Sequence, residues 1–239
     1  MTDATKTAIA HPASTIILLR PKSKVTTCND LNNFEVLLLL RNKAVKFAGG
    51  SWVFPGGRID QTDYTESPSD VYQAARTSAV RESKEEANLE LNINDFHFFS
   101  HWTTPKAEKK RFATWFFIAQ LDCHQKIRVD DSEIVGYQWL SPSAALALHE
   151  DKQLNILPPA YLSLLELSKF RDIETALEFI NQRDTPHYLP NMIFHDETAS
   201  ILLNNDCSYC HGDINAKGLQ HRLTLKDSVW RYINTIQLT

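Results

Sequence analysis

The sequence predicts a mixed α+β fold, in which helices sandwich a mixed β-sheet. Short apolar runs at 13–19 and 34–40 have the length and composition of buried strands. An aromatic run at 111–121 is equally typical of a strand. A long segment at 68–87 carries the start signals of a helix. Strands and helices that follow one another in this irregular order are typical of α+β proteins.

The predicted elements follow from local signals in chain order. After a flexible arm at 1–12, the strand at 13–19 leads through a polar segment at 21–33 to the strand at 34–40. Ser67 and Pro68 read as the cap and first residue of a helix that ends at about Ala87. Further strands are predicted at 89–91, 96–103, 111–121 and 133–140, further helices at 142–148, 158–170 and 173–182, and short strands with turns over 188–238.

Composition limits the classes of protein to which the chain can belong. Hydrophobic residues make up 43% and charged residues 23%, which is ordinary for a globular domain. The net charge of −4 argues against a nucleic-acid binder, because phosphate backbones require clustered Lys and Arg. The sequence contains no apolar run long enough to span a bilayer, and its first residues do not resemble a targeting signal. We therefore expect a cytoplasmic protein without a membrane or nucleic-acid partner, and a homodimer is compatible with the sequence.

Three glutamates near the end of the predicted long helix point to metal chemistry. Glu82, Glu85 and Glu86 are spaced so that they share one helix face. Carboxylates this close repel one another unless a cation lies between them, and hard oxygen ligands favour Mg²⁺ or Mn²⁺. Upstream, Gly56 and Gly57 form a turn whose N–H groups can face a phosphate. The alternative is a solvated acidic face beside an ordinary tight turn.

These residues resemble the Nudix hydrolase box, G-x5-E-x7-R-E-U-x-E-E-x-G-U, where U is a bulky apolar residue. Gly57 fits the first glycine, and Arg81, Glu82, Glu85, Glu86 and Leu89 fit the second half. Asp63 stands in place of the first glutamate, and the spacer 64–80 is longer than that of the family, so Asp63 is assigned no role. Ser83 replaces an apolar residue, and Asn88 replaces the glycine, a mild change at a left-handed helix end.

The resemblance implies a Nudix-type α/β/α sandwich at 13–170, with 171–239 as an α+β extension packed on the same domain. It implies metal-assisted hydrolysis of a nucleoside diphosphate linked to another group. Glu82, Glu85 and Glu86 would hold Mg²⁺ or Mn²⁺. Arg81 would orient Glu85, and Glu133 would be a further ligand or the water-activating base. Gly56 and Gly57 would shape the turn beside the phosphates.

The segment before the box resembles a signature of coenzyme A hydrolases, L-L-T-x-R-[SA]-x3-R-x3-G-x3-F-P-G-G. The chain keeps the spacing, with Leu37-Leu38, Arg41, Lys46, Gly50 and Phe54-Pro55-Gly56-Gly57 at the matching positions. It departs at Leu39, Asn42 and Lys46, where the signature has Thr, a small residue and Arg. Flanking segments resemble the Nudix branch that includes the mammalian peroxisomal coenzyme A diphosphatase.

This signature favours coenzyme A or an acyl derivative as substrate, with Arg41 and Lys46 as phosphate-binding residues. Two alternatives remain open: a pyrophosphatase acting on ADP-ribose or another dinucleotide, and a non-catalytic ligand-sensing module. An ordinary exposed loop is the competing interpretation for Arg41 and Lys46.

Two of the four cysteines form a C-x-x-C pair that could be mistaken for a metal or haem motif. Cys207 and Cys210 are followed by His211. Haem attachment requires export, for which the sequence shows no signal. A zinc site completed by His211, His221 or His195 lacks a second cysteine pair. We expect a reduced pair without metal.

Overall fold

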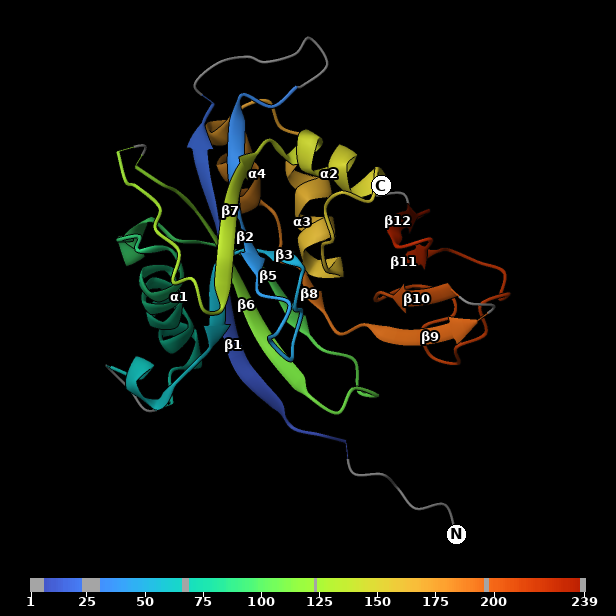
Figure 1. Ribbon diagram of the computed structural model, residues 1–239. Helices are drawn as coiled ribbons and strands as arrows, with labels where there is room; N and C mark the ends of the chain where they lie inside the picture. The colour runs from blue at the N-terminus through green and yellow to red at the C-terminus, as the bar shows by residue number, and fades with distance from the viewer. Residues whose placement is uncertain (1–6, 23–30, 66–68, 123, 196–197, 237–239) are drawn as a thin grey trace.

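The computed structural model describes residues 7–22, 31–65, 69–122, 124–195 and 198–236 (Figure 1). The strands are β1 (Ala10–Pro21), β2 (Phe34–Arg41), β3 (Trp52–Val53), β4 (Gly56–Arg58), β5 (His97–Thr103), β6 (Arg111–Gln120), β7 (Ile134–Leu140), β8 (His187–Tyr188), β9 (Asn191–His195), β10 (Thr198–Leu202), β11 (His221–Lys226) and β12 (Val229–Asn234). The helices are α1 (Val71–Ala87), α2 (Pro142–Glu150), α3 (Pro158–Leu167) and α4 (Ile173–Gln182), with short 3₁₀ turns η1 (Gln61–Asp63) and η2 (Ile93–Asp95).

The main sheet is mixed, as predicted. Its order is β3-β2-β1-β6-β5-β8, with β4 paired to β1 and β7 paired to β2. β1 runs parallel to β6 along its length and antiparallel to β2 and β4. The sheet opens on one side of β1, because β2 pairs with the end of that strand and β4 pairs with its beginning. This fork places the glycine turn of β4 beside the carboxyl end of β2.

Helices cover both faces of this sheet. α1 packs on one face through small residues such as Ala75 and Ala79, which share a core with alternate strand residues such as Leu37 and Leu39. α2, α3 and α4 cover the other face and surround a second core (Figure 1). Alternate residues of each strand therefore belong to different cores, which explains the continuous apolar runs of β1 and β2. The predicted α/β/α sandwich is confirmed.

The structure corrects several predicted boundaries. The long helix begins at Val71 with Asp70 as its cap, whose side chain accepts from the N–H of Gln73. Ser67 and Pro68, the predicted start, lie outside the described residues. The strand expected at 89–91 is irregular, because the chain there passes directly into η2. β1 begins at Ala10, so the last residues of the predicted N-terminal arm belong to the sheet.

The C-terminal region forms a small four-stranded antiparallel sheet of order β12-β11-β10-β9. It is joined to the rest of the molecule by a buried histidine of α2. Nε2 of His149 accepts from the N–H of Trp230 at 2.9 Å, and Nδ1 donates to the carbonyl of Leu154 at 2.9 Å. The indole N–H of Trp230 donates to the carbonyl of Ile156 at 3.1 Å. The boundary predicted between 170 and 171 stays a prediction.

The loop before β11 is held by a buried ion pair. Arg222 donates to both carboxylate oxygens of Asp206, at 2.7 Å each. Asp206 also accepts from the N–H groups of Ser208 and His221, so its charge is fully paired.

In the described part of the chain, no helix combines the length and apolar character that crossing a bilayer requires.

Candidate active site

The last turns of α1 carry the carboxylates that the sequence singled out. Glu82, Glu85 and Glu86 lie on this part of the helix, where it faces the β4 turn. Asn88 ends the helix in the left-handed conformation, with φ of 56° and ψ of 37°. Asn tolerates this conformation better than most residues, because its short polar side chain can form hydrogen bonds with the local backbone. The helix therefore ends as predicted, although the family's glycine is missing.

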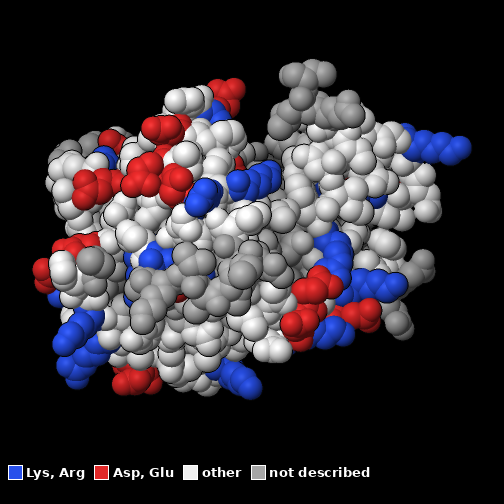
Figure 2. All heavy atoms as spheres, turned by 90° about the horizontal axis from the view of Figure 1, so that it is seen from above, with Lys and Arg blue, Asp and Glu red and all other residues white. Residues whose placement is uncertain are grey.

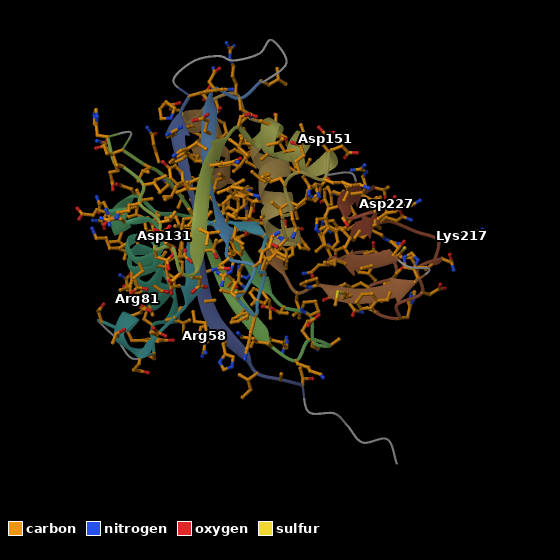
Figure 3. The ribbon with its side chains drawn as sticks, viewed as in Figure 1. Arg58, Arg81, Asp131, Asp151, Lys217 and Asp227 are labelled. Carbon is orange, nitrogen blue, oxygen red and sulfur yellow. The ribbon has the colours of Figure 1, made fainter. Side chains whose placement is uncertain are left out.

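Arg81 is the centre of an ion-pair network. Its Nε and Nη2 donate to the two oxygens of Asp63, each at 3.0 Å. Its Nη1 donates to Glu82 and to Glu85, each at 2.9 Å. The bond with Asp63 raises the pKa of Arg81, although burial opposes this. Figure 3 shows Arg81 on the side of the sheet that α1 covers, near Arg58, whose carbonyl accepts from Arg81 at 3.0 Å.

Asp63 is a site residue to which the sequence assigned no role. Its residue is only 2% exposed, and it accepts from the N–H of Asp60 at 2.8 Å as well as from Arg81. The extra spacer residues lie between η1 and the start of α1, so they do not separate Asp63 from Arg81. The signal was present in the sequence, because Asp63 stands at the position of an acidic residue in the box.

The two glycines of β4 allow close approach of the glutamates and the backbone. A Cβ at Gly57 would lie 2.3 Å from Oε1 of Glu82, so any side chain there would displace that carboxylate. A Cβ at Gly56 would lie 2.3 Å from the carbonyl oxygen of Ser14 on β1. The N–H of Gly56 donates to Oε2 of Glu86 at 3.0 Å. The turn and the helix end thus form one surface.

Burial and mutual repulsion perturb the carboxylates. Glu86 is 5% exposed, and its burial raises its pKa to about 8, although the N–H of Gly56 and the charge of Arg41 oppose this. Burial also raises the pKa of Glu82, against the opposing influence of Arg81. Glu133 lies close enough to raise both pKa values further.

Arg41 joins Glu86 to Glu133. Its Nη2 forms an ion pair with Glu133, and its Nη1 lies 4.0 Å from Oε1 of Glu86. Its Nε donates to the carbonyl of Phe47 at 3.2 Å. Asp130, which the sequence did not single out, accepts from the N–H of Glu133 at 2.9 Å and fixes the start of β7.

Most of the predicted site residues therefore lie in one network, and one lies apart from it. The network contains Arg41, Gly56, Gly57, Arg81, Glu82, Glu85, Glu86 and Glu133. Lys46 is exposed on the loop after β2, and no described residue forms an ion pair with it. Its predicted contact with a phosphate stays a prediction.

The donor set is compatible with a hard divalent cation. Among the described residues, no three acidic, histidine or cysteine side chains converge to bind one ion, since Arg41 and Arg81 pair with the carboxylates. The three glutamates nevertheless supply the hard oxygen ligands that a divalent cation prefers. A cation between them would offset the burial and the mutual repulsion that raise the pKa values of Glu82 and Glu86.

The C-x-x-C pair lies in the loop that precedes β11, away from this network. Both cysteines are free; Cys210 is exposed, and Sγ of Cys207 donates to the carbonyl of Ala216 at 3.3 Å. Their predicted lack of a metal remains an expectation.

Comparison with known proteins identifies relatives over most of the chain. The model of the NUDIX domain family matches residues 11–159. A Xenopus laevis protein named acyl-coenzyme A diphosphatase NUDT19 is 22% identical over 313 aligned positions, covering 83% of this chain and 82% of its own length. The human protein of the same name is 33% identical over 118 residues, which cover 47% of this chain and 32% of that protein.

A solved structure supports the fold. The NUDIX hydrolase from Alicyclobacillus acidocaldarius superposes with a TM-score of 0.63 at 19% identity, covering 75% of this chain and 100% of its own.

Proposed function

Since the chain belongs to the NUDIX hydrolase family, we propose that it cleaves coenzyme A or an acyl-coenzyme A. The products would be adenosine 3′,5′-bisphosphate and a 4′-phosphopantetheine compound. Two relatives named acyl-coenzyme A diphosphatase support this substrate class.

The position of Arg41 is the observation that carries the proposal. Arg41 follows the leucines of β2 in the segment that resembles the coenzyme A signature. Its guanidinium lies between Glu86 and Glu133, and its side chain is 14% exposed. A guanidinium can bind a phosphate through two parallel hydrogen bonds. Arg41 can thus bind a phosphate group beside the carboxylates if that phosphate replaces Glu133 as its partner.

We assign the cation to Glu82, Glu85 and Glu86. A bound Mg²⁺ or Mn²⁺ supplies charge neutralisation for the diphosphate and a water of lowered pKa. Glu86 is held by the N–H of Gly56 and Glu82 lies against Gly57, so both carboxylates are fixed at the turn. Arg81 orients Glu85 through its bond at 2.9 Å and is itself fixed by Asp63.

Glu133 is the proposed proton acceptor for the attacking water. Its side chain is 50% exposed, so water reaches it, and the N–H groups bound by Asp130 fix its backbone. Exchange of Arg41 from Glu133 to a substrate phosphate would free this carboxylate to accept a proton. One movement of Arg41 would then both bind the substrate and release the base.

A small nucleotide-linked substrate also agrees with the surface. On the face shown in Figure 2, Lys and Arg side chains are interspersed with Asp and Glu, and the described residues form no extended basic field there. Nucleic acids favour continuous basic surfaces, so this face offers them no evident footprint.

The proposal is tested with a substrate panel in Mg²⁺ and in Mn²⁺, with products identified by mass. We expect the coenzyme A products to appear faster than products from ADP-ribose or dinucleotides. A preference for ADP-ribose would favour the alternative pyrophosphatase, and absence of turnover on the whole panel would favour a ligand-sensing module.

Arg41→Ala gives a sharper test of the 3′-phosphate. Loss of one charge-assisted contact costs about 1.5–3 kcal/mol, so kcat/KM for coenzyme A should fall roughly ten- to hundredfold. Dephospho-coenzyme A lacks the 3′-phosphate and should lose less. Arg20→Ala is the matched control, because Arg20 pairs with Glu35 at 2.7 Å at the opposite end of β2. Equal losses on both substrates would remove Arg41 from 3′-phosphate recognition.

A further inference from the structure

Two loops meet beside the candidate active site through a pair of aromatic rings. Phe47 belongs to the loop 42–50 and Phe112 to the beginning of β6. Their ring centroids are 5.4 Å apart with an interplanar angle of 59°. The rings are therefore tilted against each other and not stacked face to face. Phe47 is 46% exposed, an unusual degree of exposure for a phenylalanine in a folded chain.

The loop that carries Phe47 is fixed to the network of Arg41 and Glu133. The carbonyl of Phe47 accepts from Nε of Arg41 at 3.2 Å. The N–H of Asn42 donates to the carbonyl of Glu133 at 2.8 Å, and the N–H of Gly50 donates to the carbonyl of Arg41 at 3.0 Å. The loop is also closely packed, because a Cβ at Gly49 would lie 2.7 Å from a carbonyl oxygen of the same loop. The exposed ring is thus held at a set position beside the site.

The two segments that carry this ring pair also carry exposed lysines. Nζ of Lys110 lies 5.4 Å from the ring centroid of Phe112 and covers that ring. The remaining lysines are exposed, and none forms an ion pair with a residue in the described ranges; they are Lys43 and Lys46 on one loop and Lys106 and Lys109 on the other. Unpaired cations on the same loops as an exposed aromatic ring favour a ligand that combines a flat ring with negative charge.

We propose that Phe47 is the stacking platform for the purine base of the substrate, and that the lysines of the two loops act with Arg41 in binding its additional phosphate. This inference rests on the proposed function, because it assigns the nucleotide half of the substrate to these loops. An acyl chain is the competing occupant, but an apolar chain gains nothing from five lysines. A nucleoside bisphosphate satisfies both the ring and the cations.

The test of the platform is calorimetric titration of each half of the substrate. Phe47→Ala should weaken binding of adenosine 3′,5′-bisphosphate about tenfold, the usual scale for loss of one stacked base. Binding of 4′-phosphopantetheine should not change. Phe47→Leu should behave like the alanine variant, and Phe47→Trp should retain affinity, because only a flat ring restores stacking. Unchanged bisphosphate affinity, or a loss confined to phosphopantetheine, would overturn the assignment.

Phe179→Ala is the matched control. Phe179 is 45% exposed on α4 and contacts another aromatic ring, Phe170, at a centroid distance of 5.2 Å. The Phe179→Ala variant should bind adenosine 3′,5′-bisphosphate and 4′-phosphopantetheine with the affinities of the unmodified protein. A loss equal to that of Phe47→Ala would mean a general effect of removing an exposed ring, and would remove the platform.

The lysines are tested with Lys106→Ala/Lys109→Ala. This variant should weaken the bisphosphate several-fold more than adenosine monophosphate, and the difference should shrink in high salt. Lys226→Ala, at an exposed lysine on β11, is the control. Equal losses for the two nucleotides would overturn the phosphate role of the loop.

These titrations separate the platform from the proposed reaction. If coenzyme A is cleaved but Phe47→Ala binds both nucleotides normally, the stacking role of Phe47 is disproved and the proposed reaction is unaffected. If coenzyme A is not cleaved but the variant weakens adenosine monophosphate, the platform stands and the proposed substrate fails.

Discussion

At the scale of single residues, the site is a set of carboxylates whose repulsion is balanced by two arginines. Arg81 pairs with Glu82 and Glu85, while Arg41 joins Glu86 to Glu133. Each arginine is planar and always charged, so it can contact two carboxylates in a set geometry. The same arginines would be partners for negative charge brought by a substrate.

We expect Glu85→Gln and Glu86→Gln each to lower kcat by orders of magnitude, because an amide is a weak ligand for a hard cation. Activity of the unmodified protein should be lost in EDTA. Circular dichroism should show an intact fold. Glu90→Gln is the control, because Glu90 is exposed just beyond α1 and pairs only with Lys84 among the described residues. Normal turnover of both site variants would contradict the assignment of the ligands.

Asp63→Asn should destabilise the protein and reduce turnover. The side chain of Asp63 is 2% exposed and carries both bonds from Nε and Nη2 of Arg81. Loss of its charge removes the most buried of the carboxylates that pair with Arg81, which costs about 1–3 kcal/mol. Urea denaturation measures the change. Asp60→Asn should have little effect, because that carboxylate is 66% exposed and 3.9 Å from Arg81.

At the scale of elements, the site forms where the last turns of α1 lie against the glycines of β4. The helix delivers its glutamates in its last turns, and the glycines of β4 leave room for them. The left-handed residue at the helix end turns the chain away immediately afterwards. The position of that residue therefore limits how far the carboxylates extend along the helix.

Asn88→Ala should destabilise the protein by about 1–2 kcal/mol, because a Cβ without a compensating polar group is disfavoured at positive φ. Asn88→Gly should be at least as stable as the natural sequence, because glycine adopts this conformation freely. Thermal unfolding of the two variants measures the difference. An alanine variant as stable as the glycine variant would show that the helix end is not under this strain.

The sequence predicted these elements unevenly, for identifiable reasons. Long apolar strands and the end of α1 were readable, since periodicity and the Asn88 signal are local. The contact between Asp63 and Arg81 was not, because it depends on how the chain returns after the spacer. The pairing of β8 with β5 also escaped prediction, since a two-residue strand has no periodicity. Local sequence patterns are enough to predict helices, strands and motif positions. Contacts between residues separated by a long spacer depend on the whole fold and cannot be predicted in this way.

At the scale of the molecule, the four-stranded sheet and the main domain share one core through α2, α3 and β12. Figure 3 shows Asp151, Lys217 and Asp227 on the side of this small sheet, and Arg58, Arg81 and Asp131 on the opposite side. The small sheet therefore lies on the side of the molecule away from Arg81 and the candidate active site. His149 is the polar joint, because both of its ring nitrogens are bonded and it is 1% exposed.

His149 should make stability depend on pH. Burial lowers its pKa, although its bond to the carbonyl of Leu154 opposes this. The unfolded chain therefore binds a proton more readily than the folded one, and stability must fall as pH decreases below about 6.5, the ordinary pKa of histidine. His149→Gln lacks this titration. The difference in unfolding free energy between the two proteins should shrink from pH 8 to pH 5, and a constant difference would contradict the assignment.

The parallel pairing of β1 with β6 also has a consequence for how the chain is made. Ala10 is paired with Arg111, so the strand at the centre of the sheet must wait for a partner about a hundred residues downstream. At roughly 5–20 residues per second, a ribosome leaves β1 without that partner for on the order of ten seconds. Non-local pairings of this kind also slow folding, because loop closure precedes the contacts that reward it. β2 and β4 are made earlier and can pair with one edge of β1, but the edge that faces β6 stays unpaired through that interval. An unpaired apolar edge of this kind makes the nascent chain a candidate for binding by chaperones.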